Sequence, residues 1–301
     1  SAEAKPEQIG LNYGKDPSIM VVNWALYDTT EESAVVEYGT SKDRLDASVN
    51  ASGTTYTIDD YTSPMLFSAT IDNLESGNKV YYYRVGSTIT GDFSDVFSFK
   101  SHPGIGDDKP MTIHVVGDPG QTQNSINTYQ EILDNENDLQ TLSGGTLVLG
   151  DLSYANGDQP KWDTYGNMRQ FLSGSVPMMH TPGNHEWFDD KSSEFIAYKA
   201  RYTNPSDQMY YSYSLGLAHI MMVAGYCTDM KTTHSQPCLA EGTPEYDWLV
   251  NDLASVNSSV TPWTFVIFHQ PYVNSNTHHS IQSEGTCLWS IVQYIILIIL
   301  L

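Results

Sequence analysis

The sequence has 301 residues, of which 40% are hydrophobic and 17% are charged, which is typical of a globular protein and excludes a disordered one. This length allows two ordinary domains, each with a buried core. Thirty-six acidic and 14 basic side chains give a formal net charge of −22, which argues against nucleic acid and anionic membrane as partners.

The first hundred residues read as short β-strands. Runs rich in β-branched and aromatic residues predict strands at 19–24, 33–38 and 79–85, and turn clusters such as 75–78 separate them. Short runs at a spacing of about ten residues are typical of a β-sandwich. Residues 1–103 contain one histidine, His102 at their far end, and no cluster of metal-binding side chains. We therefore expect residues 1–103 to form a sandwich that supports the rest of the chain.

A stretch rich in Pro and Gly, 101–110, is predicted to be a linker, and strands alternate with helices after it. The expected strands are 111–117, 146–150, 176–180 and 264–268, and the expected helices are 125–135, 159–172 and about 243–256. The last helix has an N-cap residue, Thr243, followed by Pro244 at its first position. This alternation predicts a layered α/β domain over residues 104–301.

Polar residues that can bind metals follow four of the predicted strands. The four clusters are Gly117-Asp118-Pro119-Gly120, Gly150-Asp151-Leu152-Ser153-Tyr154, Gly183-Asn184-His185-Glu186 and Phe268-His269-Gln270-Pro271. Sites in open α/β sheets form outside the carboxyl ends of the strands, so we expect all four clusters to converge on one edge. A single Gly-Asp pair is common in turns, but four clusters in this order are difficult to attribute to chance.

The residue types of these clusters suit the hydrolysis of a phosphate ester. That reaction needs a nucleophile at mild pH and neutralisation of the negative charge on the phosphoryl oxygens. Two metal ions supply both. A carboxylate can bridge two ions; amide oxygen and imidazole suit a divalent ion, and carboxylate and phenolate oxygens suit a trivalent one. Bound cations would also reverse the local sign of this strongly acidic protein.

The blocks G-D-P-G, G-D-L-S-Y, G-N-H-E and V-I-F-H resemble the first four of five signature blocks of the purple acid phosphatases, which are calcineurin-like metallophosphoesterases. The resemblance extends from about Pro6 to about Cys287. Most metallophosphoesterases have a His where Gly120 stands here, and in this family the Tyr of the second block, Tyr154, replaces that ligand. The resemblance implies an all-β sandwich (fibronectin type III-like) followed by an α/β four-layer metallophosphoesterase domain with mixed sheets.

The resemblance also implies a set of metal ligands. Asp118 and Tyr154 would bind Fe(III), Asp151 would bridge the two metals, and Asn184 and His269 would bind a divalent ion, which is Zn, Mn or Fe. The implied function is an acid phosphatase that hydrolyses phosphomonoesters by attack of a metal-bound hydroxide. Two alternatives stay open: a phosphodiesterase or nucleotide pyrophosphatase on the same site, because pocket walls choose the substrate, and an inactive truncated binding module. The resemblance is also compatible with a homodimer.

Three histidines are expected to act on the phosphate ester without binding a metal. His185 would orient the phosphate and assist proton transfer. His278 and His279 follow His269 by nine and ten residues, which matches the substrate-binding His pair of the family. One of the pair could protonate the leaving alkoxide at acidic pH, where imidazole is charged. In a polar loop they could instead be simply solvated.

The remaining histidines match no block of the family. We expect His180 and His219 to be structural residues near strands and His234 to be exposed. Glu186, the neighbour of His185, is expected to support the site or to begin a helix, not to bind a metal.

The fifth block, G-H-x-H, should supply one His to each metal, and it is absent. After Cys287 the chain continues as an apolar tail, 288–301, which is too short to span a bilayer by itself. Three interpretations are a truncated or frame-shifted gene model, the start of a transmembrane segment, and a genuine terminal strand or helix. We expect the domain to be incomplete at the C-terminus, with a steep loss of metal affinity.

The chain does not begin with methionine and shows no charged-then-apolar leader, which a processed secretory protein would have lost. Sequons at Asn50 and Asn257 fit a secreted or vacuolar glycoprotein. Three cysteines are too few for a disulfide scaffold. Cys227 and Cys238 could pair across a short polar loop and leave Cys287 over, or all three could be free thiols.

Overall fold

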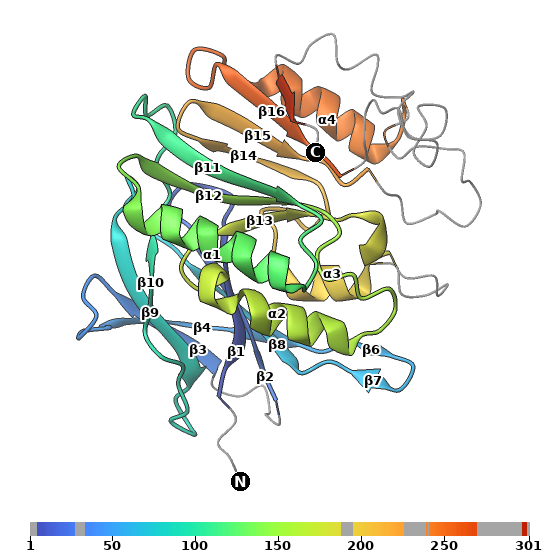
Figure 1. Cartoon of the computed structure of the whole chain (residues 1–301). Coiled ribbons are helices and arrows are strands. Elements are labelled where there is room, and N and C mark those ends of the chain that lie inside the picture. The colour runs from blue at the N-terminus through green and yellow to red at the C-terminus, as the bar shows by residue number, and fades with distance from the viewer. Residues whose placement is uncertain are drawn as a thin grey trace.

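The computed structural model describes residues 5–27, 34–187, 195–225, 239 and 241–269, and the backbone of 297–299. Along the chain, a block of antiparallel strands precedes a block in which strands and helices alternate (Figure 1). The predicted fold class, a sandwich followed by a layered α/β domain with mixed sheets, is confirmed. None of the helices in these ranges has the length and apolarity needed to cross a membrane.

The sandwich consists of two four-stranded antiparallel sheets. The first has the order β1-β2-β8-β5, with bounds Glu7–Tyr13, Met20–Leu26, Met65–Ile71 and Ser52–Thr54. The second has the order β10-β9-β3-β4, with bounds Phe97–Lys100, Val80–Ser87, Ala34–Gly39 and Ala47–Asn50. Alternation along β9 buries Tyr81, Tyr83 and Val85 between the sheets and leaves Arg84 outside. A short hairpin, β6 (Thr57–Ile58) and β7 (Tyr61–Thr62), extends from this block.

The second block has four layers. A parallel sheet has the order β11-β12-β13, with bounds Met111–Gly117, Leu142–Leu149 and Met178–Thr181. A mixed sheet has the order β14-β15-β16-β17, with bounds Tyr211–Leu215, Ala218–Met222, Trp263–Ile267 and Leu297–Ile299. Figure 1 shows helices α1 (Gln123–Asp138) and α2 (Pro160–Ser173) over the first sheet and α4 (Pro244–Ser255) over the second. A short helix, α3 (Ile196–Arg201), lies near the hairpin.

The alternation of side chains along the strands explains the layers. Leu147 and Leu149 of β12 belong to the apolar cluster between the two sheets, together with Ile220 and Met222 of β15. Val148, which points the other way, packs in the cluster beneath α1 and α2. The intervening residues of β15 and β16 pack against α4. Both sheets are therefore covered on two faces, which is why central strands such as β12 and β16 end in continuous apolar runs.

Most elements of the second block lie where the sequence predicts them. Helix α1 begins two residues before its predicted start, because Thr122 and Ser125 form a reciprocal capping box. Helix α4 begins as predicted: Thr243 accepts a hydrogen bond from the N–H of Tyr246, and Pro244 occupies the first position. The sequence analysis did not predict α3, β14 or β15, whose short polar-apolar runs give weak signals.

The two blocks share a continuous core, which the linker prediction did not anticipate. The Asn12 side-chain amide donates to the carbonyl of Met178 at 2.6 Å, and Tyr83 Oη donates to the carbonyl of Gly174 at 2.7 Å. In the connecting segment His102 is buried, and its Nδ1 accepts a hydrogen bond from the N–H of Gly104. Burial lowers the pKa of His102 to about 4. The exact division at 103/104 remains a prediction.

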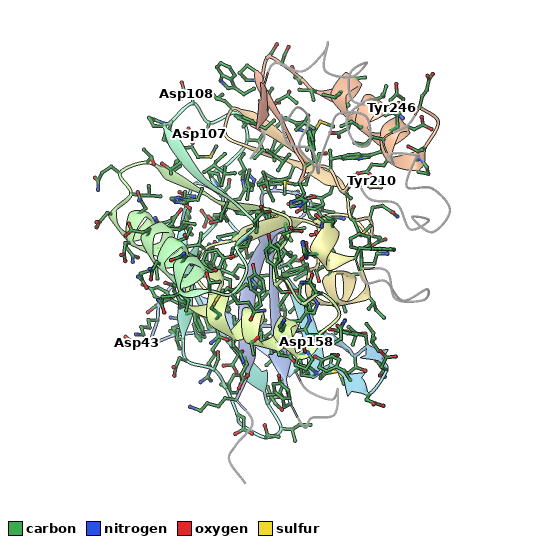
Figure 2. The ribbon with its side chains drawn as sticks, turned by 45° about the vertical axis from the view of Figure 1, so that its right-hand side comes forward. Asp43, Asp107, Asp108, Asp158, Tyr210 and Tyr246 are labelled. Atoms are coloured by element: carbon green, nitrogen blue, oxygen red, sulfur yellow. The ribbon has the colours of Figure 1, made fainter. Side chains whose placement is uncertain are left out.

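The acidic charge of the protein is spread over its surface. Figure 2 shows Asp43, Asp108 and Asp158 on separate parts of the molecule, and all three are exposed. Solvent and counter-ions screen such charges from one another. The surface charge therefore carries little information about the site, where the carboxylates are close together and partly buried.

Glu245, in the first turn of α4, is a buried carboxylate that holds the chain after β15. It accepts hydrogen bonds from the N–H groups of Ala224 (2.7 Å) and Gly225 (3.2 Å). Burial raises the pKa of Glu245 from 4.5 to about 7. Because the folded-state pKa lies above the unfolded one, this group stabilises the protein fully below pH 4.5, and the stabilisation is lost as the pH rises toward 7.

We expect a Glu245→Gln variant, which keeps the acceptor oxygen, to lose less stability than the wild type between about pH 5 and about pH 8. The difference should be on the order of 1–3 kcal/mol, since one pKa unit corresponds to about 1.4 kcal/mol. Urea unfolding at both pH values measures it. Glu131→Gln, on the exposed face of α1, is the matched control and should follow the wild type. Equal losses in all three proteins would contradict proton binding by Glu245.

Candidate metal centre

Four strand ends bring the predicted ligands together, but they belong to two sheets. Asp118 follows β11, Asp151 follows β12 and Asn184 follows β13, at the carboxyl edge of the parallel sheet. His269 follows β16, which belongs to the facing mixed sheet. The expectation of one sheet edge was therefore wrong for the fourth cluster. The clusters nevertheless converge, because the carboxyl ends of β16 and the first sheet lie on the same side of the domain.

The imidazole of His269 lies at the centre of this group. Its Nε2 is 3.1 Å from Asn184 Oδ1 and 3.4 Å from Asp151 Oδ1, and its Nδ1 is 3.5 Å from Asp118 Oδ1. Asp118, Asp151 and His269 each offer a ligand atom within 4.8 Å of the others, which makes them the one such group in the part of the chain that the structure describes. Asp151 is buried, whereas Asp118 is exposed.

The donor set fits a metal ion. His269 Nδ1 lies 2.9 Å from the carbonyl oxygen of Leu149, and the N–H of Nδ1 donates to that oxygen. Nε2 then presents a lone pair to the oxygens of Asn184 and Asp151. Three acceptors facing one another are satisfied by a cation between them. A ligating His that donates its other N–H to a carbonyl is the usual arrangement in metal sites.

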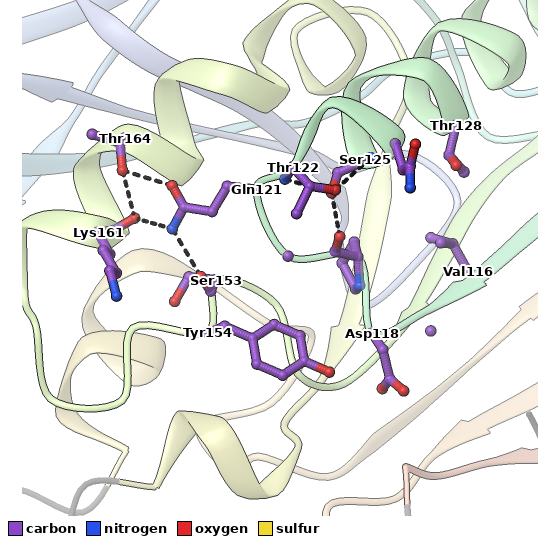
Figure 3. Close-up of a pocket in the computed structure, with 14 residues that line it drawn as sticks. Val116, Asp118, Gln121, Thr122, Ser125, Thr128, Ser153, Tyr154, Lys161 and Thr164 are labelled. Carbon is purple, nitrogen blue, oxygen red and sulfur yellow. Dashed lines mark hydrogen bonds between the residues drawn. The ribbon is translucent and has the colours of Figure 1, made fainter.

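Tyr154 adds a phenol to the same group. Its hydroxyl lies near the Asp151 carboxylate, and Figure 3 shows it pointing toward Asp118. Burial, and then the charges of Asp151 and Asp118, raise the pKa of the Tyr154 phenol. Burial also raises the pKa of the Asp118 carboxyl. A cation bound here would reduce the repulsion between the negative charges of Asp118 and Asp151. Phenolate and carboxylate oxygens suit a hard ion.

The ligand loops have a strained backbone. Asp118, Asp151 and Tyr154 have φ angles of 50°, 53° and 49°, in the left-handed region that side chains other than Gly rarely adopt. Each such residue costs on the order of 1–3 kcal/mol and persists only where the surroundings hold it. A Cβ on Gly183 would lie 2.2 Å from Asp151 Oδ1, and one on Gly150 would lie 2.6 Å from the His269 ring. These contacts explain the glycines next to the ligands.

The presence of Gly120 next to Tyr154 has a steric reason. Gly120 has a φ of 58°, and a Cβ added to it would lie 3.2 Å from Cδ2 of the Tyr154 ring. A larger side chain at position 120 would therefore compete with this ring for the same space. The two positions are coupled through contact, although 34 residues of sequence separate them.

Glu186 supports the ligand loops from below. Its buried carboxylate accepts hydrogen bonds from the N–H groups of Asp151 (2.7 Å), Leu152 (2.8 Å) and Gly183 (2.7 Å). Burial raises the pKa of Glu186 to about 7. These bonds tie the loop after β12 to the loop after β13, which agrees with the supporting role expected from the sequence.

His185 lies beside the ligands. Its ring centre is 4.5 Å from that of Tyr154, its Nε2 is 3.7 Å from Asp151 Oδ2, and its backbone N–H donates to Asp151 Oδ1 at 3.0 Å. The Nδ1 of its ring makes a short hydrogen bond with Asn156 Oδ1. Sequence reasoning missed Asn156. The Asn156-Gly157 pair signals only a turn, and nothing local links it to His185.

Other residues singled out in the sequence lie away from the centre or cannot be placed. His180 is buried in β13 with its ring centre 4.2 Å from that of Tyr202. His219 links β15 to α4 through Asp252 Oδ2 at 2.8 Å from its Nε2. Both are structural, as expected. The following residues lie outside the described part of the chain: His234, His278, His279, Cys227, Cys238 and Cys287.

Comparisons with known proteins agree with this geometry. Residues 6–101 match the family model of the purple acid phosphatase N-terminal domain, and residues 111–295 match that of the calcineurin-like phosphoesterases. The chain belongs to the purple acid phosphatases. It is 33% identical over 295 residues to the phosphoenolpyruvate phosphatase of onion (Allium cepa), an alignment that covers 93% of this chain and 57% of that protein.

Other members of the family show the same relation. Purple acid phosphatase 22 of Arabidopsis thaliana is 32% identical over 94% of this chain and 61% of its own length. A purple acid phosphatase from yellow lupin (Lupinus luteus) seeds has the same fold, with a TM-score of 0.83 at 21% identity, over 99% of this chain and 58% of that one. The chain therefore spans about three fifths of the length of the purple acid phosphatases that it matches.

Proposed function

We propose that this chain hydrolyses phosphomonoesters as an acid phosphatase, at a dinuclear Fe(III)–M(II) centre in which M is Zn, Mn or Fe. The observation that carries the proposal is the convergence of Asp118, Asp151 and His269, with ligand atoms within 4.8 Å of one another. Tyr154 and Asn184 complete a donor set of carboxylate, phenol, amide and imidazole at the same point.

The donor types suggest how the two ions are held. Asp118 and Tyr154 would hold Fe(III), because hard oxygen donors suit a trivalent ion. Asn184 and His269 would hold the divalent ion, and Asp151, which lies near both groups, would bridge the pair. When bound, such a pair supplies a nucleophile at mild pH and neutralises charge on the phosphoryl oxygens.

Residues of the chain itself would orient the substrate. His185 is held from both sides, by Asn156 at Nδ1 and by the Tyr154 ring, so its Nε2 stays at the face of the site. Because Nδ1 donates to Asn156 Oδ1, Nε2 donates a hydrogen bond to a phosphate oxygen in the imidazolium form, which can also assist proton transfer. His278 and His279 remain the predicted partners for the substrate and the leaving alkoxide.

A cavity next to the candidate ligands offers room for the leaving group. Its volume is about 760 Å³, and Asp118, Tyr154 and Gly120 lie on its wall (Figure 3). Its other walls come from the starts of α1 and α2 and include Asn124 and Lys161. An alcohol or small acid released from the phosphate could therefore occupy a hydrated pocket lined by hydrogen-bonding groups.

The proposal is tested by the visible spectrum of purified protein loaded with iron and a divalent metal. We expect a broad charge-transfer band near the green region from tyrosinate bound to Fe(III). A Tyr154→Phe variant should lose this band, whereas a Tyr210→Phe variant, which changes a tyrosine packed against Trp248, should keep it. A protein that takes up no iron and shows no band would contradict the proposal.

The substrate class is tested by comparing hydrolysis of a phosphomonoester and a phosphate bis-ester by the same metal-loaded protein. We expect the monoester to be hydrolysed faster, because an anionic phosphate with three free oxygens makes more contacts with two cations. We also propose a secreted or vacuolar protein. The exposure of both sequon residues, Asn50 and Asn257, supports this location.

A further inference from the structure

The hairpin β6–β7 of the sandwich reaches the α/β block beside the ligand loop. Tyr56, directly before the hairpin, donates from its hydroxyl to Gln159 Oε1 at 3.2 Å. On the other strand, the hydroxyl of Tyr61 donates to Asp163 Oδ2 at 2.8 Å. Gln159 and Asp163 flank the start of α2, so the hairpin is fixed to the end of the loop that carries Asp151 and Tyr154 (Figure 1).

Between these two anchors, Ile58 inserts its side chain into the α/β block. Ile58 is 6% exposed and belongs to the apolar cluster that contains Ala155 and Trp162. It also lines a small cavity together with His185 and Glu186. A residue of the sandwich thus shares an apolar cluster with the loop after β12 and lines the same small cavity as the loop after β13.

The loop that Ile58 contacts needs external support. Asp151, Tyr154 and Asn156 all have φ angles near 50°, a conformation that the surroundings must maintain. Glu186 holds the first part of this loop, through the N–H groups of Asp151 and Leu152. In the second part, Ala155 belongs to the same apolar cluster as Ile58, and Gln159 accepts a hydrogen bond from Tyr56.

We propose that the β6–β7 hairpin is a positioning element of the metal centre, and that Ile58 is the residue through which the sandwich fixes Tyr154, Asn156 and His185. Ala155 lies between Tyr154 and Asn156, so a shift of Ala155 toward space vacated by Ile58 moves both neighbours. Asn156 in turn holds the ring of His185. The sandwich therefore contributes to the site, in addition to supporting the fold.

The test compares Ile58→Ala with Ile71→Ala. Ile71 is fully buried in β8 and belongs to a different apolar cluster from Ile58, the one that also contains Leu147 and Leu149. Both variants lose a similar apolar volume and should show a lower Tm. The first readout is the side-chain NMR spectrum of ¹⁵N-histidine-labelled, metal-free protein, with His185 assigned from a His185→Asn variant. We expect the His185 resonances to shift in Ile58→Ala and to stay in place in Ile71→Ala.

The second readout, which rests on the proposed function, is the affinity for Zn²⁺ measured by calorimetry. We expect a decrease of about tenfold in Ile58→Ala, as for other residues that orient ligands, no decrease in Ile71→Ala, and recovery in Ile58→Val. Failure of the wild type to bind Zn²⁺ would count against the proposed function, while the NMR readout still decides the role of the hairpin.

Unchanged His185 resonances in Ile58→Ala, or equal shifts in Ile71→Ala, would overturn the proposal. If Ile58→Ala does not fold, Tyr56→Phe supplies the milder test, because it removes only the hydroxyl, which donates to Gln159 and accepts from Arg201. A shift of the His185 resonances in Tyr56→Phe supports the role of the hairpin, and their constancy contradicts it.

Discussion

Replacing Asp151 by asparagine is expected to remove bound metal from the protein, with an affinity loss of at least about 100-fold. Asp151 is buried, lies 3.4 Å from His269 Nε2 and adjoins Tyr154, so it is next to the proposed ligands of both ions. Asparagine keeps the size of the side chain and an acceptor for the His185 N–H, but it removes the charge and the second carboxylate oxygen. Phosphatase activity should fall below detection together with the metal.

Metal content after dialysis and the Tm with and without Zn²⁺ measure this effect. Zn²⁺ at about 100 times its Kd should stabilise the wild type by about 2.7 kcal/mol and leave Asp151→Asn unchanged. Without metal the variant should be at least as stable as the wild type, because the repulsion with Asp118 is reduced. Asp158→Asn, in the same loop but exposed, is the control and should bind metal normally. Normal metal binding by Asp151→Asn would refute the bridging role.

Replacing Arg201 by methionine is expected to destabilise the protein by about 3–5 kcal/mol, the usual cost of leaving one partner of a buried ion pair. Arg201 is buried in α3, and its Nη2 lies 2.9 Å from Asp163 Oδ1. The same nitrogen donates to the hydroxyl of Tyr61 at 3.0 Å, and Nη1 donates to Gln8 Oε1 at 2.8 Å. Methionine fills similar space but leaves the Asp163 carboxylate without its cation.

Urea unfolding measures this loss. The control is Arg44→Met, because the Arg44–Asp46 pair is exposed and such pairs contribute about 0–1 kcal/mol. A double variant, Arg201→Met with Asp163→Leu, should regain part of the lost stability, since it also removes the unpaired charge. A loss below about 1 kcal/mol in Arg201→Met would show that the stability of the protein does not depend on this ion pair.

The sequence analysis singled out the candidate ligand residues because each lies in a short local pattern. Asp118, Asp151, Asn184 and His269 all follow apolar strands, and glycines adjoin several of them. Strand periodicity, turn residues and helix caps act over a few residues, so they can be read along the chain. These local patterns predicted the bounds of β11 without error and those of α1, α2 and α4 to within a few residues.

The tertiary structure decided what depends on residues far apart in the sequence. Only the folded chain brings His269 to the site from a second sheet, places Asn156 on the ring of His185, and buries Arg201 beside Asp163. It also shows that the sandwich, which was expected only to support the rest of the chain, lies next to the ligand loops through Ile58. Such contacts arise from the packing of whole layers, and no local pattern encodes which distant side chains will meet. The sequence by itself determined the chemistry of the ligands, and the packing of sandwich, sheets and helices determined how they are held.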